Sequence, residues 1–447
     1  MFFAAGELFF SSHGSSGLKN RRKKGYHIMV SNEKKTAKKS LAVAFFCSAV
    51  YFCSYLTRKD LAIALVAITE ATGFSDSAIA AVPVCLFITY GIGQTVNGAI
   101  GDRVPPQYLI TGGMLLSAAC NFLLPVCTGV PAMCVVWSIN GFAQAMLWPP
   151  ISKIMIYTYS GAQYSTASML VSLSASLATV TGYLYIPAVL AVSEWRTVFY
   201  IGAAAVVLCA AAWSFYSFRQ DFIGDAGAAS APGAEKQKEK SKEPAVPRAV
   251  VLTVALILLD VIAVGMLRDG VETWMPTFIK ESFGGGAGDS ILISVMVALF
   301  SCVCVVLTTY IYRRYFTNEL VFCASVFGIA TVLSAVLFFA HGKNMIASVI
   351  CISLLAAVMH GANMALTAYV PHTMKRFGHV CTVSGIINSA VYIGAALSTY
   401  GAARIKDGYG WGAAIGVWIA ISALGVLLSV ISAVFWKRNV INAKENV

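Results

Sequence analysis

The chain has 447 residues, of which 58% are hydrophobic and only 12% are charged. Soluble globular proteins carry roughly 25% charged residues, so this composition excludes an ordinary soluble domain. A transmembrane helix needs about 20 apolar residues, and twelve runs of about this kind can be marked along the sequence. Strands of a membrane barrel would alternate in segments of roughly ten residues, a pattern that the sequence lacks. The sequence therefore predicts an all-α polytopic membrane protein.

The formal net charge is +12, and most of the basic residues lie outside the apolar runs. Short loops rich in Lys and Arg stay on the cytoplasmic side of a membrane. We therefore expect both termini and the central loop in the cytoplasm of a multi-pass protein of the cell membrane, with the lipid bilayer as its partner. Since topology explains the basic runs, they do not call for a nucleic acid partner. These runs contain Arg21, Arg22, Lys23, Lys24, Lys34, Lys35, Lys38, Lys39, Lys236, Lys238, Lys240, Lys242, Lys437, Arg438 and Lys444.

Composition along the chain divides it into five parts. Residues 1–40 are expected to be a basic, disordered arm, and translation could begin at Met1 or at Met29. The other parts are an N-terminal six-helix half, a charged cytoplasmic linker that cannot build a core, a C-terminal six-helix half and a cytoplasmic tail. Their bounds are 41–217, 218–248, 249–436 and 437–447.

The twelve expected spans fall into two sets of six on either side of the basic linker. This layout resembles the major facilitator fold, whose halves are parallel repeats, and it implies a central cavity between the halves. In the fourth span, Trp148-Pro149-Pro150 predicts a break in the intrahelical hydrogen bonds. The spans are expected near 41–68, 77–100, 107–128, 131–158, 165–192, 196–217, 249–279, 288–312, 316–340, 344–372, 379–404 and 409–436.

Two arginines lie inside apolar segments, one in each half: Arg58 and Arg268. An arginine at the centre of a membrane helix costs about 2.5–3.5 kcal/mol on insertion scales, so it usually faces a polar interior and marks a functional site. The planar guanidinium suits carboxylate and phosphate because it forms bidentate hydrogen bonds. We interpret the two arginines as opposite walls of an anion site. The alternatives are a structural ion pair with an acid such as Asp60 for Arg58, or its extension toward the helix end.

Acidic side chains near Arg268 allow a second interpretation. Asp269 is adjacent and Glu272 is one helical turn away, so both could neutralise Arg268. Together with Asp260, they could instead carry protons for coupled transport. His360, inside the tenth span, could bind substrate, could titrate near neutrality and carry the proton of a symporter, or could be a hydrogen-bonded core histidine.

The loop between the second and third spans carries Asp102 and Arg103, which we expect to make gating contacts rather than substrate contacts. No enzyme constellation is present: the sequence has no phosphate-binding loop, nucleophile elbow or zinc pattern, so we expect no catalytic residues, metal or cofactor. Its twelve cysteines lie almost entirely in apolar runs, without metal-binding or disulfide spacing.

Several blocks of sequence resemble the organophosphate:phosphate antiporters of the major facilitator superfamily, which include glycerol-3-phosphate and hexose-phosphate transporters. The resemblance extends from about residue 45 to residue 435 and covers both halves. The blocks that carry it are Tyr55-Leu56-Thr57-Arg58-Lys59-Asp60, Tyr90-Gly91, Gly101-Asp102-Arg103, Gly141-x-x-Gln144-x-Met146-x-Trp148-Pro149-Pro150 and Leu267-Arg268-x-Gly270-x-x-x-Trp274-x-Pro276-Thr277.

The resemblance implies that Arg58 and Arg268 bind phosphate and that Tyr55 and Tyr392 line the site. It also places Gln94 where the family often has a lysine, and His360 where it has a tyrosine. With acids added beside Arg268, the site has lost positive charge relative to the family. A monoanionic or carboxylated substrate is therefore the alternative to a phosphate ester.

We expect a monomeric secondary transporter that exchanges an organic phosphate for inorganic phosphate by alternating access. The alternative is a proton-coupled symporter of a carboxylated or other organic anion. A third possibility, from another class, is a membrane sensor that binds a sugar phosphate without transporting it.

Overall fold

A computed structural model describes residues 15–74, 76–79, 81–219, 247–284 and 287–442. The chain forms two units, Met1–Phe45 and Phe46–Val447. In the first unit, residues 15–45 are helical, whereas the sequence predicts disorder through residue 40. Most of the expected linker and the end of the expected tail lie outside the described residues.

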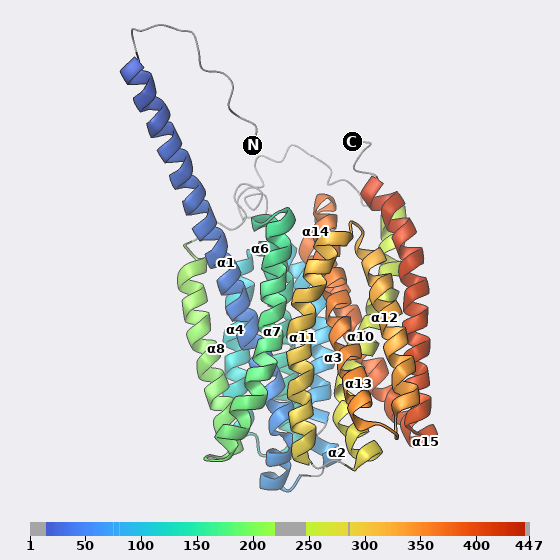
Figure 1. The fold of residues 1–447 in the computed structure, drawn as a ribbon. Coiled ribbons are helices and arrows are strands. Elements are labelled where there is room, and N and C mark those ends of the chain that lie inside the picture. The colour runs from blue at the N-terminus through green and yellow to red at the C-terminus, as the bar shows by residue number, and fades with distance from the viewer. Residues whose placement is uncertain (1–14, 75, 80, 220–246, 285–286, 443–447) are drawn as a thin grey trace. The chain divides into compact units, whose positions relative to one another are not determined.

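The described residues form helices and contain no strand. The second unit begins within the first helix, and its helices lie side by side (Figure 1). The elements are α1 (Ser15–Thr72), α2 (Asp76–Ile79), α3 (Ala81–Arg103), α4 (Pro106–Leu123), η1 (Leu124–Val126), α5 (Val130–Ala145), α6 (Trp148–Thr158), α7 (Gly161–Leu190), α8 (Trp195–Ser217), α10 (Arg248–Phe283), α11 (Ala287–Tyr315), α12 (Glu319–Ala340), α13 (Met345–Met364), η3 (Ala365–Tyr369), α14 (Val370–Thr373), η4 (Met374–Phe377), α15 (Val380–Trp436) and η5 (Lys437–Ile441).

Each of the twelve expected spans falls on helical residues, which confirms an all-α polytopic fold. Ten helical stretches of the described chain are long and apolar enough to cross a membrane. The other two expected spans lie on α3 and α11. Helix α3 contains the polar side chains Gln94 and Asn97 among its apolar residues, and the first side chains of α11 are not among those described.

Three spans contain interruptions with identifiable causes. Helix α5 ends at Ala145 and α6 begins at Trp148, so the fourth span breaks at the diproline as the sequence predicts. The tenth span contains the π-helical stretch η3 before Pro371. The last two expected spans are continuous in α15 except at Gly410, whose φ of 79° lies in the left-handed region that glycine adopts without strain.

Helices α10 and α15 pack backbone against backbone at two glycines. A Cβ added to Gly265 would overlap the carbonyl of Val391, and one added to Gly394 would overlap the carbonyl of Ile262. Small residues at such contacts let membrane helices approach closely without a hydrophobic driving force. This packing fixes the position of Tyr392, which is adjacent to Val391, relative to α10.

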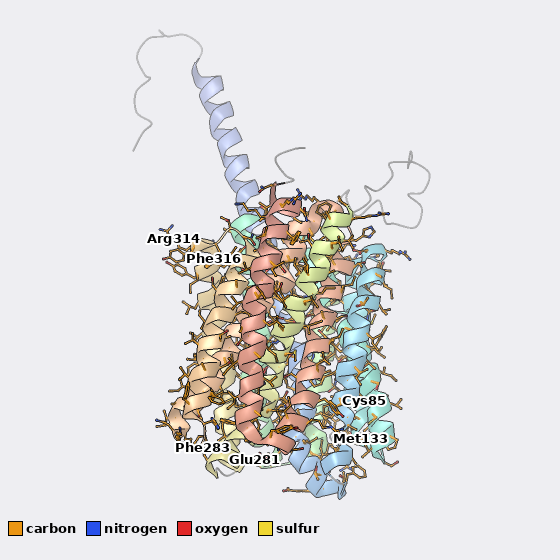
Figure 2. All side chains as sticks on the ribbon, turned by 90° about the vertical axis from the view of Figure 1, so that its right-hand side faces the viewer. Cys85, Met133, Glu281, Phe283, Arg314 and Phe316 are labelled. Carbon is orange, nitrogen blue, oxygen red and sulfur yellow. The ribbon has the colours of Figure 1, made fainter. Side chains whose placement is uncertain are left out.

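Large apolar side chains cover much of the surface of the second unit. Leu208, Phe339 and Ile346 are each more than 70% exposed, which suits contact with lipid rather than water. In Figure 2, Glu281 and Phe283 lie at one end of the bundle and Arg314 and Phe316 at the other. Helix α11 therefore extends along the length of the bundle.

We predict that Gly265→Leu destabilises the protein by about 1–3 kcal/mol or more, because the new side chain would have to displace the α15 backbone. Thermal unfolding of the purified protein, followed by fluorescence-detected size exclusion, measures the effect. Gly328→Leu is the control, since nothing lies within 4 Å of a Cβ added to Gly328. Equal stability of the two variants would contradict the close packing of α10 and α15.

Candidate functional site

Arg58 lies on α1, is 6% exposed and is enclosed by aromatic rings. Its guanidinium carbon lies 4.5 Å from the ring centre of Tyr55 and 4.1 Å from that of Tyr90. A cation over an aromatic face gains about 0.5–2 kcal/mol, with the larger values at desolvated sites. The rings therefore offset part of the cost of removing the charge from water.

Neutral groups accept the hydrogen bonds of this guanidinium. Nε donates to Oε1 of Gln144 at 2.8 Å, Nη1 donates to the hydroxyl of Tyr392 at 2.9 Å, and Nη2 donates to Oγ of Ser54 at 3.3 Å. Among the described residues, no carboxylate lies within ion-pair distance of Arg58. Its positive charge is therefore solvated by dipoles but not neutralised.

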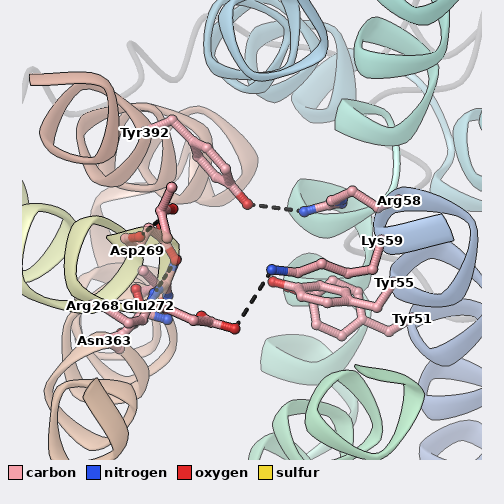
Figure 3. Close-up of polar contacts among 11 residues, drawn as sticks. Tyr51, Tyr55, Arg58, Lys59, Arg268, Asp269, Glu272, Asn363 and Tyr392 are labelled. Carbon is pink, nitrogen blue, oxygen red and sulfur yellow. Dashed lines mark hydrogen bonds and ion pairs between the residues drawn. The ribbon is translucent and has the colours of Figure 1, made fainter. Parts of the chain in front are cut away.

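The other cations of the site are paired with acids (Figure 3). Nζ of Lys59 lies 3.6 Å from Oε1 of Glu272 and joins α1 to α10. Arg268 donates from Nε to Oδ1 of Asp269 at 2.9 Å and from Nη2 to Oδ2 at 2.7 Å. Asp269 thus occupies the Nε and Nη2 donors, one of the pairs through which a guanidinium can bind an oxyanion in a bidentate way.

The resulting site is only weakly positive. It contains three cations and two carboxylates, a formal net charge of +1. The Coulomb energy of a charged pair grows as the surroundings lose water, so the one unneutralised cation dominates the attraction for an incoming anion. Arg58 is therefore the strongest anchor that the site offers.

His360 lies near this charge cluster. It is within electrostatic range of Arg268, Asp269, Glu272 and Lys59. The structure thus brings His360 of the tenth expected span close to Arg268 of the seventh. Its neighbours include both signs of charge, so either an anion or a hydroxyl group of a ligand could use it.

Two other expected site residues have different surroundings. Gln94 is fully buried, and both polar atoms of its side chain lack a hydrogen-bond partner in the described part of the chain. Asp260 is also fully buried, but its oxygens accept hydrogen bonds from Ser429 and Ser432 at 2.8 and 2.7 Å. The acid on α10 that faces Lys59 is therefore Glu272, whereas Asp260 is bonded to α15.

The structure also places Lys59, Tyr90 and Gln144 in the site, which the sequence does not predict. Lys59 follows Arg58 directly, so two consecutive cations in an apolar segment were the available signal. Gln144 lies two residues before the break between α5 and α6, and no local pattern shows that it faces Arg58. In the described part of the chain, no group of three His, Cys, Asp or Glu side chains is arranged to hold a metal ion.

Asp102 joins the two sets of helices at the end of α3. Its carboxylate accepts hydrogen bonds from the backbone N–H groups of Cys381 and Thr382 at 2.9 and 3.0 Å, and from the hydroxyl of Thr382. A carboxylate at a helix N-terminus is stabilised by the exposed amides and the helix dipole. Arg103 is exposed. The contact holds α3 to the first turn of α15.

Tyr164 makes a second contact between the two sets. Its hydroxyl donates to the carbonyl of Ala368 at 2.7 Å, and its ring stacks on His372 at 4.1 Å between centres. Lys375 also reaches across, to the carbonyl of Ile156 at 3.1 Å. These contacts lie on the same end of the bundle as Asp102.

The fold and the site together define a polytopic helical membrane protein with a buried cation where its two sets of helices meet. The sequence model of the Major Facilitator Superfamily matches residues 47–399. The chain belongs to this superfamily. Membership agrees with the expectation that the protein is not an enzyme.

Among curated relatives, a probable hexose phosphate transport protein of Chlamydia muridarum is 29% identical over 123 residues, 28% of this chain and 26% of the relative. The glycerol-3-phosphate transporter of Bacillus subtilis is 26% identical over 255 residues, 53% of this chain and 56% of the relative. The membrane sensor protein UhpC of Escherichia coli is 29% identical over 110 residues, 25% of each chain. The matches thus span about a quarter to a half of these relatives.

Solved structures show the same fold. The transporter FucP in its outward conformation aligns with a TM-score of 0.66 at 13% identity, covering 87% of this chain and 98% of FucP. The proton:xylose symporter XylE aligns with a TM-score of 0.71 at 10% identity, covering 89% of this chain and 96% of XylE. At such low identities the similarity confirms the major facilitator fold and does not indicate which substrate the chain binds.

We predict that Asp102→Ala increases the rate at which a membrane-permeant maleimide labels Cys381. This thiol is fully buried, and its residue is held to α3 by the carboxylate. Peptide mass spectrometry after timed labelling measures the rate. Cys351, a buried thiol on α13, provides the internal control in the same sample, and equal acceleration at both thiols would indicate general unfolding instead of local opening.

Proposed function

We propose that the protein is a secondary transporter that exchanges an organic phosphate for inorganic phosphate by alternating access. The observation that carries this proposal is the guanidinium of Arg58, which is buried, lacks a carboxylate partner among the described residues and touches Tyr392 across the two sets of helices. The relatives named as hexose phosphate and glycerol-3-phosphate transporters support phosphate as the anionic group.

Exchange follows from the electrostatics of the empty site. A buried cation without a counter-ion is costly, and the cost is lower when an anion occupies the site. An empty carrier would have to move Arg58 through the transition without that compensation, whereas a loaded carrier would not. A bound anion that bridges the two sets of helices also favours the closed state over either open one.

Asp269 has a definite part in this proposal. It would stand in for substrate in the fork of Arg268 and leave when a dianionic phosphate binds. The phosphate could then be held by both arginines, as the sequence predicts.

A second candidate is proton-coupled symport of a carboxylated organic anion. The ion pair between Arg268 and Asp269 favours it, because this pair leaves one unneutralised cation, which suits a monoanion. In that case Asp269 and Glu272 would keep their ion pairs with Arg268 and Lys59 when substrate binds. A pH gradient across the membrane would drive uptake.

The proposed topology has both termini and the linker in the cytoplasm, with residues 41–217 and 249–436 as the two six-helix halves of a monomer. The basic residues outside the spans support it. In this orientation the contacts of Asp102 and Tyr164 close the cytoplasmic end.

We predict rapid uptake of labelled phosphate into proteoliposomes that are loaded with unlabelled phosphate at equal pH. Arg58→Lys keeps the charge but loses the planar fork, and a lost charged hydrogen bond costs about 1.5–3 kcal/mol, which corresponds to a rate about 10–150-fold lower. Arg404→Lys is the control, since Arg404 is exposed on α15. Exchange at the wild-type rate in Arg58→Lys would contradict the role of the guanidinium.

We also predict that Asp269→Asn lowers the phosphate concentration that half-saturates exchange, because the neutral amide competes less well for the fork of Arg268. The dependence of the initial exchange rate on phosphate concentration measures this change. Asp407→Asn, at an exposed acid three residues before Gly410 in the middle of α15, should leave it unaltered. A weaker apparent affinity in Asp269→Asn would show that Asp269 contributes to binding instead of opposing it.

A further inference from the structure

Asp60 is a second buried charge on α1 that the anion site does not use. It lies two residues after Arg58 and is 0% exposed. Its Oδ1 accepts a hydrogen bond from the backbone N–H of Leu61 at 2.7 Å, whereas Oδ2 has no partner in the described part of the chain. No cation lies within ion-pair distance of it among these residues.

The unpartnered oxygen of Asp60 lies close to Gly202 on α8. A Cβ built on Gly202 would lie 3.7 Å from Oδ2 of Asp60 and 3.8 Å from Oδ1 of Asn121. Asn121, on α4, is also 0% exposed, and its Oδ1 likewise lacks a partner there. Two buried oxygens that accept hydrogen bonds therefore lie near the same glycine, and neither has a donor among the described residues.

Tyr185 on α7 adds a third group to this region. Its hydroxyl is buried and without a partner in the described residues, and it lies within electrostatic range of Asp60. A hydroxyl can donate one hydrogen bond and accept others. The cluster thus contains hydrogen-bond acceptors on three helices, and it has too few donors to satisfy all of them.

An ionised carboxylate in these surroundings would cost several kcal/mol, because neither an opposite charge nor a full set of donors compensates it. A proton on Oδ2 removes the charge and creates an O–H group, which can donate to an acceptor such as Oδ1 of Asn121. We propose that Asp60, Asn121 and Tyr185 form a proton-binding site that controls Arg58.

Polar groups lie between this site and the anion site, and Ser117 takes part with both its backbone carbonyl and its hydroxyl. Nδ2 of Asn121 donates to the carbonyl of Ser117 at 2.9 Å, and Oγ of Ser117 donates to Oδ1 of Asn140 at 2.7 Å. Nε2 of Gln144 lies 3.5 Å from Oγ of Ser117 and from Oδ1 of Asn140. Oε1 of Gln144 accepts a hydrogen bond from Arg58. The side chains come from α4, α5 and α1.

The amide of Asn121 gives these polar groups two arrangements. With Asp60 protonated, Oδ1 of Asn121 accepts from the acid and Nδ2 donates to Ser117, as the structure shows for Nδ2. When the proton leaves, the carboxylate accepts only, so the amide must rotate to present Nδ2 to Asp60 and gives up its bond to Ser117. The change reaches Gln144 and thereby the acceptor that orients Arg58.

Asp260 provides a matched control. It is equally buried and lies on α10, the helix that carries Arg268, but hydroxyl groups of Ser429 and Ser432 donate to both of its oxygens. The two acids therefore differ in whether their oxygens are satisfied. Asp→Asn is the same chemical change at both positions.

The first test needs no substrate and therefore does not depend on the proposed transport function. Infrared difference spectra of the purified protein at neutral pH, in H2O and in D2O, detect the stretching band of a protonated carboxyl group. We expect one such band to be absent from Asp60→Asn and present in Asp260→Asn. Retention of every protonated-carboxyl band in Asp60→Asn would overturn the proposal.

The second test rests on the proposed transport of phosphate, whether or not that transport is also driven by a proton gradient, and measures coupling as a ratio of two rates. Uptake of labelled phosphate into proteoliposomes is compared with and without an acidic exterior, and the ratio of the two rates is the readout. We expect this ratio to fall to about one in Asp60→Asn and to stay at the wild-type value in Asp260→Asn. An unchanged ratio in Asp60→Asn, or stimulation by a Na⁺ gradient in place of a pH gradient, would overturn coupling through a proton.

The two tests distinguish a failure of the proposed transport function from a failure of the proposed proton site at Asp60. If the wild-type protein carries no phosphate, the proposed function fails, while the infrared bands still decide whether Asp60 holds a proton.

Discussion

The structure depends on how the charge of Arg58 is accommodated in an apolar bundle. The cost of burying a guanidinium is met by two aromatic faces and three neutral acceptors, and none of these removes the charge. Three of these partners lie on other helices: Tyr90 is on α3, Gln144 on α5 and Tyr392 on α15. An anion that binds here therefore acts on several helices at once, which is how a local electrostatic event could move the two sets of helices.

The remaining charges limit what this cation attracts. Because Lys59 pairs with Glu272 and Arg268 with Asp269, the site holds five charged groups but a net charge of only +1. The pair between Lys59 and Glu272 also connects α1 to α10, so it opposes separation of these helices. Substrate charge and helix movement are thus linked through the same side chains, and a change at either acid should alter both.

Much of this arrangement could be predicted from the sequence, because membrane helices must be long and apolar. The expected spans fall on helices, and the break before Trp148 follows from the diproline. Arg58 stood out since an arginine is rare in an apolar run. The neighbours of Arg58 could not be predicted, because Gln144 and Tyr392 are 86 and 334 residues away along the chain.

Asp60 shows the limit of reasoning from sequence spacing. In sequence it is near enough to Arg58 to be its counter-ion. Two residues turn the chain by about 200° around a helix, and the structure accordingly places Arg58 toward Gln144 and Asp60 toward Gly202. The pairing of Arg268 with Asp269 is one alternative that the sequence allows, but only the structure shows that Nε and Nη2 are the donors that Asp269 occupies.

The role of Arg58 as the anchor for substrate can be tested by measuring the binding of anions without transport. Ligand that binds the folded state raises the melting temperature as its concentration increases. We predict that inorganic phosphate and glycerol 3-phosphate stabilise the purified protein, and that Arg58→Lys loses this stabilisation while Arg404→Lys keeps it. Equal stabilisation of the wild-type protein and Arg58→Lys would contradict the claim that the unneutralised guanidinium is the anchor for substrate.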